Sequence, residues 1–188
     1  METKKITGFF RLIFTLAVMC IFYGCASSAA KVDYAEDVKP NIDITDNQSV
    51  DVNIDSTDKA DLLSYEKERL HALIANKLQE RGVKLFNTGD GDSEILKLIV
   101  KVTRHDKGNA FARAMLAGLG QIHIDGDVEV IDESTDTKLT SYSVKKTFAW
   151  GGIYGASTTI EDVEAGFAAG VVDGLLGPSE KDKNKEEK

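Results

Sequence analysis

The residue with the clearest chemistry in the sequence is Cys25, which follows Gly24 at the end of an apolar run. A cysteine thiolate is a nucleophile and can take a lipid group on its sulfur. The run before it, residues 12–23, contains 12 residues, whereas a helix needs about 20 apolar residues to cross the core of a bilayer. These features favour covalent modification of Cys25 over a place in a membrane span.

The first 24 residues have the layout of a secretory signal, with three positive side chains, a short apolar run and polar sequence directly after it. This segment resembles a bacterial lipoprotein signal peptide, although Phe22 and Tyr23 depart from the leucine and small residue usual there. The resemblance implies cleavage before Cys25 and a diacylglyceryl group on its sulfur. Two or more acyl chains hold a protein stably at a membrane. The alternative is an uncleaved helix that anchors weakly.

Ala26 stands where an inner-membrane retention signal of that class has aspartate. The resemblance therefore favours a lipid anchor in the outer membrane, facing the periplasm.

The composition restricts the partners and the chemistry of the chain. Its formal net charge is −8, and cleavage would remove three positive and one negative side chain to leave −10. An acidic chain without a basic cluster is unsuited to neutralising phosphates, so we expect no binding to nucleic acid. Cys20 and Cys25 are the only cysteines, and neither is left as a free thiol in a processed, lipidated chain. Disulfides and cysteine-based metal sites are thereby excluded.

We predict four parts in the chain. Residues 1–24 are the signal peptide, residues 25–57 an acidic flexible tether, residues 58–177 a globular domain, and residues 178–188 a charged disordered tail. The tether is rich in Asp, Asn, Ser and Thr, a composition that buries little apolar surface. Two stretches in it, NIDITD and SVDVNID, alternate apolar and polar residues and allow one short edge strand.

The domain begins with a helical pattern over 58–81, for which Asp58 is the predicted cap and Gly82 the predicted stop. Two strands over 83–106 with a turn at 88–91 form a predicted hairpin. After an insert, strands over 121–132 and 138–150 alternate cleanly and form a second hairpin.

A last helix runs from about 157 to 177. Thr158 and Glu161 form its predicted capping box, and Gly177 ends it. The predicted fold class is α+β. We expect a two-layer sandwich with a mainly antiparallel sheet of four to five strands and two helices packed on one face.

The insert between the hairpins, residues 109–121, is mostly small or apolar. One interpretation is a segment that touches a membrane or a protein partner. The other, which we favour, is a short packed helix or an ordinary connection under the sheet, because buried connections usually explain such composition. The residues for the first interpretation are Phe111, Met115, Leu116, Gly118, Leu119 and Gly120.

Gly166, Gly170 and Gly174 recur every four residues along the last helix and clear one stripe of side chains. Each glycine costs a helix about 1 kcal/mol relative to alanine, so three in register indicate a close contact. Acidic residues on this helix argue against a membrane span. Packing within the domain is favoured over packing against another subunit.

No group of residues in the sequence has the spacing of a catalytic or metal site. The glycines of residues 149–158 lack the lysine of a phosphate-binding loop, and GDGDSE lacks the spacing of a calcium loop. His71, His105 and His123 do not pair at ligand spacings. We expect neither an enzyme nor a metal or other cofactor.

The domain from Leu62 to Leu176 resembles an uncharacterised bacterial lipoprotein family, domain of unknown function 4410. The similarity lies in LKLIVKVTRHDKGNAFARAMLAGLGQIHIDGDVEVIDESTDTKL, where Asp132 and Thr135 match the family pattern and Asp136 replaces its glycine. The run is also similar to periplasmic lipoproteins of the curli-secretion and TolB N-terminal kind. The resemblance implies a small α/β sandwich with a role in envelope assembly or transport, and no catalytic residues.

The sequence therefore predicts a lipid-anchored protein of the bacterial cell envelope that acts by binding. The favoured role is an accessory subunit of an assembly or transport complex, with an envelope protein or a second copy of itself as partner. The alternative is a periplasmic carrier of a small ligand or lipid, which requires a sizeable apolar pocket.

Overall fold

The computed structural model describes residues 29–36, 41–87, 94–116, 119–149 and 152–179. The strands are β1 (Lys31–Tyr34), β2 (Gln48–Ser56), β3 (Glu94–Asp106), β4 (Ile122–Asp132) and β5 (Thr137–Phe148). The helices are α2 (Ser64–Glu80), α3 (Ala110–Met115), α4 (Gly152–Ser157) and α5 (Ile160–Leu176).

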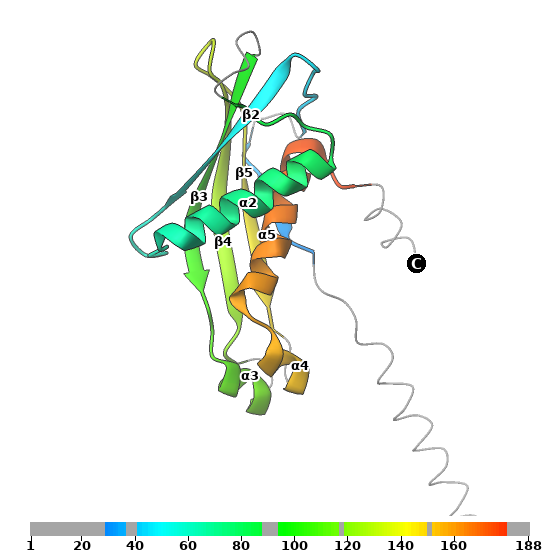
Figure 1. The fold of residues 1–188 in the computed structure, drawn as a ribbon. Helices are drawn as coiled ribbons and strands as arrows, with labels where there is room; N and C mark the ends of the chain where they lie inside the picture. The colour runs from blue at the N-terminus through cyan, green and yellow to red at the C-terminus, as the bar shows by residue number, and fades with distance from the viewer. Residues whose placement is uncertain (1–28, 37–40, 88–93, 117–118, 150–151, 180–188) are drawn as a thin grey trace, which may run out of the picture.

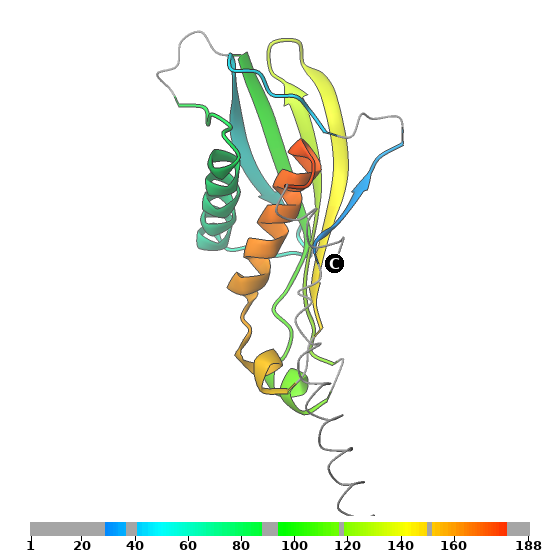
Figure 2. The same ribbon diagram turned by 90° about the vertical axis from the view of Figure 1, so that its right-hand side faces the viewer.

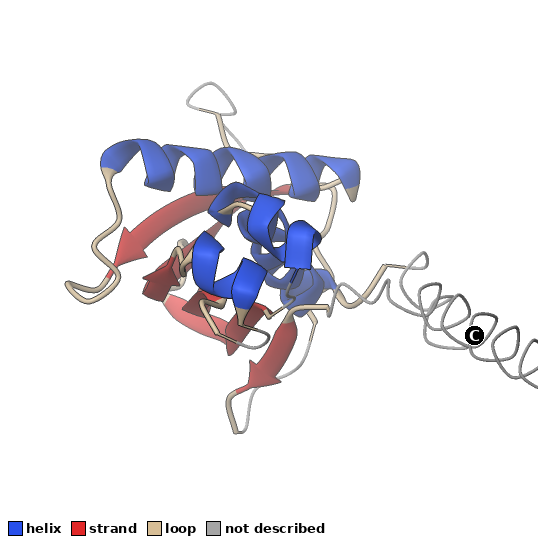
Figure 3. Cartoon of the chain, turned by 90° about the horizontal axis from the view of Figure 1, so that it is seen from below, coloured by secondary structure: helices blue, strands red, loops and turns tan. Residues whose placement is uncertain are grey.

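The strands form one sheet in the order β1-β5-β4-β3-β2, in which only the β2–β3 pair is parallel. Helices α2 and α5 lie on the same face of this sheet, as Figures 1 and 2 show. Seen along the strands in Figure 3, the sheet curves beneath α2. The predicted α+β class, with a mainly antiparallel sheet and two helices on one face, is confirmed.

The alternation of apolar and polar residues in the long strands sets which side of the sheet faces the helices. In β4, Ile122, Ile124, Val128 and Val130 are all buried against the helices, while the residues between them form the opposite face. Helix α5 meets this surface with a stripe of apolar side chains centred on Phe167, which is completely buried. This interface is the hydrophobic core of the domain.

Both long helices end close to the predicted residues. Gly82 has a φ of +81°, and the amides of Gly82 and Val83 donate to Gln79 and Leu78, which is the Schellman arrangement. At the start of α5 the capping pair is Thr159 with Asp162, whose Oδ2 accepts from the Thr159 amide at 2.9 Å. The capping box is therefore one residue later than predicted.

The start of α2 differs more from the sequence pattern. The helix begins at Ser64 rather than near Asp58. The backbone amide of Leu63 donates to Oε2 of Glu66 at 3.0 Å. The carboxylate of the first turn thus satisfies an amide at the helix start, which is half of a capping box.

The first predicted hairpin is wrong. Residues 83–86 do not form a named strand; they make a single parallel bridge, in which Leu85 lies beside Val50 of β2. β3 instead pairs with β2 in parallel and with β4 in antiparallel orientation. A parallel pair needs a crossover of a dozen or more residues, and α2 supplies it. The predicted turn at 88–91 lies outside the described residues.

The predicted tether also contains parts of the sheet. β1 pairs with β5 at one edge, and β2 pairs with β3 along nine residues at the other. The alternating apolar residues of β2, such as Val50 and Val52, are buried in the core. The alternation in SVDVNID, which allowed one short edge strand, belongs to β2. Residues 31–34 and 48–56 are therefore part of the domain and not of a tether.

The short helices α3 and α4 lie together beyond one end of the sheet, at the bottom of Figure 1. β3 and β5 lead into this end, and β4 starts from it. The opposite end carries the β4–β5 turn. Helix α4 was not predicted, because its glycine-rich sequence indicated only a turn.

Candidate functional site

Residues 109–116 and 119–120 lie at the lower end of the sheet in Figure 1, and we call them the tip loop. Its two ends meet, because the amide of Asn109 donates to the carbonyl of Gly120 at 3.2 Å. Asn109 also caps α3, since its Oδ1 accepts from the amide of Ala112 at 2.9 Å. Gly108 and Gly120 have φ values of +62° and +70°, a region that side chains other than glycine rarely adopt. These two glycines let the chain close the neck of the loop.

Arg113 holds the tip loop against the rest of the domain. Arg113 is only 3% exposed, although it lies in a surface helix. The guanidinium donates to the carbonyls of Gly155 (2.8 Å), Thr158 (2.9 Å) and Gly120 (2.8 Å), and more weakly to that of Lys107 (3.4 Å). A planar fork of five donors suits this convergence of carbonyls. One side chain therefore fastens α3, the end of α4 and the end of β3 to one another.

The apolar side chains of the tip loop point the other way, into solvent. Phe111 is 74% exposed, Met115 68%, Leu116 53% and Leu119 58%. An ordinary surface helix buries its apolar face and exposes its charges. Helix α3 does the reverse, because its large apolar side chains are exposed and its arginine is buried. We call these four residues the apolar tip. Contiguous exposed apolar groups of this kind are typical of interaction sites.

The structure corrects the second interpretation of residues 109–121, and the first stays a prediction. The segment does contain a short helix, but that helix lies beyond the end of the sheet and not under it (Figure 1). Among the six residues predicted to make contacts, four are the exposed side chains of the apolar tip. Gly120 serves the neck of the loop, and Gly118 lies outside the described residues.

A charged cluster lies between α2, α5 and the end of β3. Glu164 is completely buried on α5, and its carboxylate accepts two hydrogen bonds from Arg69 of α2, of which that from Nη2 measures 2.8 Å. Nε2 of His105, whose side chain is 1% exposed, lies 2.9 Å from Oε1 of the same carboxylate. Burial by itself raises the pKa of Glu164, but the hydrogen bonds and charges of Arg69 and His105 outweigh it, so the pKa lies below its ordinary value.

A second buried carboxylate extends the cluster toward the tip loop. Glu66 is 2% exposed and lies 2.8 Å from the ammonium of Lys107. Burial alone would raise the pKa of Glu66, but the hydrogen bonds from Lys107 and Leu63 leave that pKa below its ordinary value. Lys107 also offers its carbonyl to Arg113. The cluster and the tip loop are therefore parts of one continuous polar framework.

The framework supports a structural rather than a chemical role for its histidine. Both His105 and Glu164 are closed off from solvent, so a substrate has no direct access to them. Among the described residues, no group of three His, Cys, Asp or Glu side chains is placed to hold a metal ion. Spacing in the sequence could not reveal this cluster, since 59 residues separate His105 from Glu164. One signal was present: Glu164 falls within the apolar stripe of α5.

The three glycines of α5 lie against the sheet. A Cβ at Gly166 would meet the end of the Lys146 side chain, at Gly170 it would meet Ala30 and Val144, and at Gly174 the ring of Tyr142. The stripe therefore faces β5 and the residue before β1. This is packing within the domain, the interpretation that the sequence favoured.

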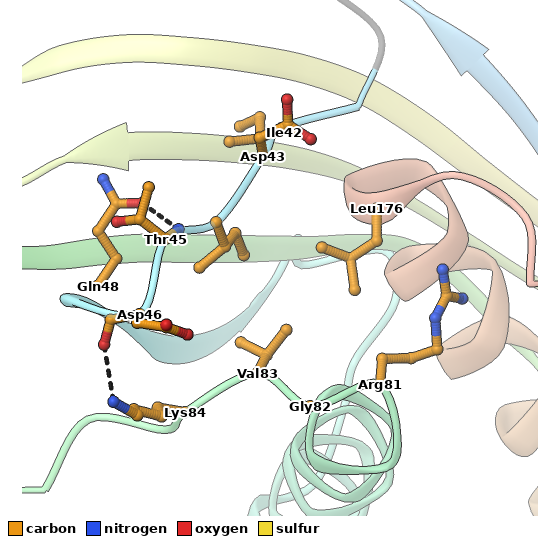
Figure 4. Close-up of a pocket in the computed structure, with 11 residues that line it drawn as sticks. Ile42, Asp43, Thr45, Asp46, Gln48, Arg81, Gly82, Val83, Lys84 and Leu176 are labelled. Carbon is orange, nitrogen blue, oxygen red and sulfur yellow. Dashed lines mark hydrogen bonds between the residues drawn. The ribbon is translucent and has the colours of Figure 1, made fainter.

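A pocket of about 280 Å³ lies at the opposite end of the domain, between residues 42–48 and the end of α2. Figure 4 shows Arg81, Lys84 and Asp46 around it, with Nζ of Lys84 donating to the Asp46 carbonyl at 2.7 Å. Its lining is mainly polar. Sites for small apolar ligands are lined mostly by hydrophobic side chains, so this pocket does not favour the carrier role that was the alternative from the sequence.

We expect Arg113→Ala to lower the free energy of unfolding by about 2 kcal/mol, because it leaves several carbonyls of the tip loop without a donor. Urea unfolding followed by circular dichroism measures this change. The matched control is Arg104→Ala, since Arg104 is 47% exposed in its ion pair with Asp106, and exposed pairs contribute at most about 1 kcal/mol. Equal effects of the two substitutions would contradict the fastening role of Arg113.

Comparison with known proteins relates the chain to one family. The family model described as "Domain of unknown function (DUF4410)" matches residues 31–152, well over half of the chain. No curated protein matches the sequence.

Several solved structures are similar to the chain at low sequence identity, and the two with a TM-score above 0.5 share its fold. The PelC dodecamer from Paraburkholderia phytofirmans superposes with a TM-score of 0.53 at 16% identity, covering 80% of this chain and 99% of that one. A variant of that dodecamer gives 0.51 at 18% identity with the same coverage. A DUF330 protein from Xanthomonas campestris gives 0.44 at 10% identity, covering 64% of this chain and 78% of that one. In the described part of the chain, no helix has the length and apolar character needed to cross a membrane.

Proposed function

The chain belongs to the family of domain of unknown function DUF4410, and from this premise we propose that it is a lipid-anchored protein of the cell envelope that acts by binding. Processing before Cys25 provides the anchor, and the domain provides the binding surface. The charged cluster does not serve catalysis in this proposal, which its burial supports.

The observation that carries the proposal is the apolar tip. Its four large apolar side chains are each more than half exposed, while Arg113 fixes the backbone beneath them through buried hydrogen bonds. A rigid loop that presents apolar groups loses little conformational freedom when it binds, which favours affinity. Such a loop is suited to docking on another surface.

We assign the protein a role as an accessory subunit of an envelope assembly or transport complex, with self-association as part of that role. The fold shared with the PelC dodecamer supports assembly of several copies. β2 is an edge strand of the sheet, and Val52 and Ile54 on it lie beyond the bridge that Val50 makes with Leu85. Edge strands are ready templates for pairing with a second chain.

The anchor is tested by growing the bacterium with labelled palmitate and separating the envelope from the soluble fraction. We expect label on the unmodified protein, and we expect the Cys25→Ser variant to lose the label and the stable membrane attachment. Cys20→Ser is the matched control, because Cys20 lies within the segment that is removed, and it should keep both. A protein without label, or a Cys25→Ser variant that keeps it, would refute the lipid anchor.

A further inference from the structure

We propose that the apolar tip inserts into the head-group layer of the same bilayer that holds the lipid anchor. The proposal rests on the lipid-anchored function above and names the occupant of the binding surface as a lipid membrane. It follows from where the anchor enters the domain, from how far it reaches, and from the chemistry of the tip loop.

The anchor enters the domain through β1. In the β1–β5 pair, Lys31 lies opposite Lys145 and Tyr34 lies opposite Tyr142. The N-terminal end of β1 is therefore directed toward Phe148, the last residue of β5. Beyond Phe148 the chain continues to α4 and the tip loop packed beside it. The segment that carries Cys25 thus joins the domain from the direction of the apolar tip.

The reach of the anchor decides which end of the domain is held near the membrane. Cys25 precedes Lys31 by six residues, which span about 21 Å at most. Phe148 lies three residues beyond Lys145, or about 10 Å along the strand, so the anchor reaches past it. Thr137, at the other end of β5, lies eight residues away, or about 27 Å, and the anchor does not reach past it. Of the two ends of the sheet, only the one with the tip loop lies within reach of the anchored membrane.

The surface presented at that end suits a lipid interface. The apolar tip combines an aromatic ring, a thioether and two leucines, and the one charged residue of the tip loop, Arg113, is turned inward. Interfacial binding grows with the apolar area buried among head groups. Because the anchor already confines the domain to the bilayer, a weak insertion is strengthened by the high effective concentration of the membrane.

The first test measures depth in the bilayer. The lipidated protein is reconstituted in vesicles of phosphatidylethanolamine and phosphatidylglycerol with brominated acyl chains, which quench nearby fluorophores. A thiol-reactive fluorophore is placed at Met115→Cys or, as control, at Ser134→Cys in the β4–β5 turn; the lipid blocks Cys25. We expect several-fold stronger quenching at position 115 than at position 134.

The second test removes the anchor and measures the tip alone. Residues 25–188 carrying Cys25→Ser, made without the signal peptide, are mixed with the same vesicles, and the partition coefficient is measured by flotation. Replacing both Phe111 and Met115 with serine should lower this coefficient by on the order of tenfold or more. The control is Leu63→Ser at an exposed leucine just before α2 (51% exposed), which should leave it unchanged.

The outcomes separate this proposal from the one on which it rests. A lipidated protein that floats with vesicles while position 115 stays unquenched would overturn insertion and leave the anchor intact. The same holds if a photo-crosslinker at position 115 captures a protein in intact cells and no lipid. A protein that carries no lipid and does not float would overturn the anchor and insertion together.

Discussion

Replacing Glu164 with leucine is expected to lower the free energy of unfolding by about 4 kcal/mol at pH 7. The carboxylate is completely buried and joins Arg69 of α2 to His105 of β3. Removing Glu164 leaves the buried His105 without this partner and Arg69 with only Glu161, 3.5 Å away. Breaking a buried ion pair costs about 3–5 kcal/mol. Urea unfolding of the purified protein at pH 7 measures the loss.

Glu164→Gln provides the matched variant, because it keeps the shape and one acceptor oxygen. We expect it to lose roughly 2 kcal/mol, since hydrogen bonds to a charged group exceed those to a neutral one by this order. A leucine variant as stable as the unmodified protein would show that Arg69 and His105 find other partners, and the cluster would then not be the link between α2, α5 and β3.

The same carboxylate gives an expected dependence on pH. Burial alone raises the pKa of Glu164, but Arg69 and His105 hold it below its ordinary value. A lowered pKa in the folded state stabilises the protein above the unfolded value of about 4.3. This stabilisation is lost as the pH falls through the folded pKa. Between pH 6 and pH 3, Glu164→Gln should therefore lose less stability than the unmodified protein; equal losses would contradict the assignment.

The second large effect is expected at Gly174. A Cβ at this position would lie 2.7 Å from Cδ2 of Tyr142 and closer still to Cε2. That ring is buried, and its hydroxyl donates to the carbonyl of Val171 at 2.6 Å, so it cannot swing aside without losing this bond. We expect Gly174→Ala to lower the free energy of unfolding by about 3 kcal/mol, the upper part of the range for overpacked cores. Thermal and urea unfolding measure it.

Gly166→Ala is the control on the same helix face. Its new methyl group would meet Cε and Nζ of Lys146, the far end of a flexible side chain that can shift. Alanine favours the helix by about 1 kcal/mol over glycine, so the net change should be near zero. If both alanines had the same effect, the glycine stripe would not be explained by contact with Tyr142.

The parts of the fold that were predictable are those in which one residue pattern has one physical solution. Strict alternation in 122–130 fixes a strand with one buried face, and the apolar stripe of 160–175 fixes a helix of known orientation. The partner of β3 was not predictable in this way. Residues 83–86 lie nearer to it in the sequence, but β2 offers nine residues of pairing and lets α2 cover the sheet.

The position of the candidate site was predictable from the sequence, but the exposure of its apolar side chains was not. The apolar composition of 109–121 marked the segment, while its exposure depends on Arg113, whose partners are carbonyls of α4 and of its own loop. The sequence does not show which backbone carbonyl accepts a hydrogen bond, because every residue has a carbonyl. Glu164 was counted among the polar residues that exclude a membrane span, although its position in the apolar stripe of α5 indicated a buried charge.

The orientation of β1 also determines how the domain bears mechanical load. In the proposed anchoring, a pull on Cys25 acts on the N-terminal end of β1. The backbone bonds between Lys31–Tyr34 and β5 are then loaded together, in shear, and not one after another as in unzipping. The hydroxyl of Tyr34, which donates to the carbonyl of Gly174 at 2.9 Å, adds a cross-link to α5 at the far end of the same strand. A short strand loaded in shear transmits tension from the envelope to the sheet without separating from it one residue at a time.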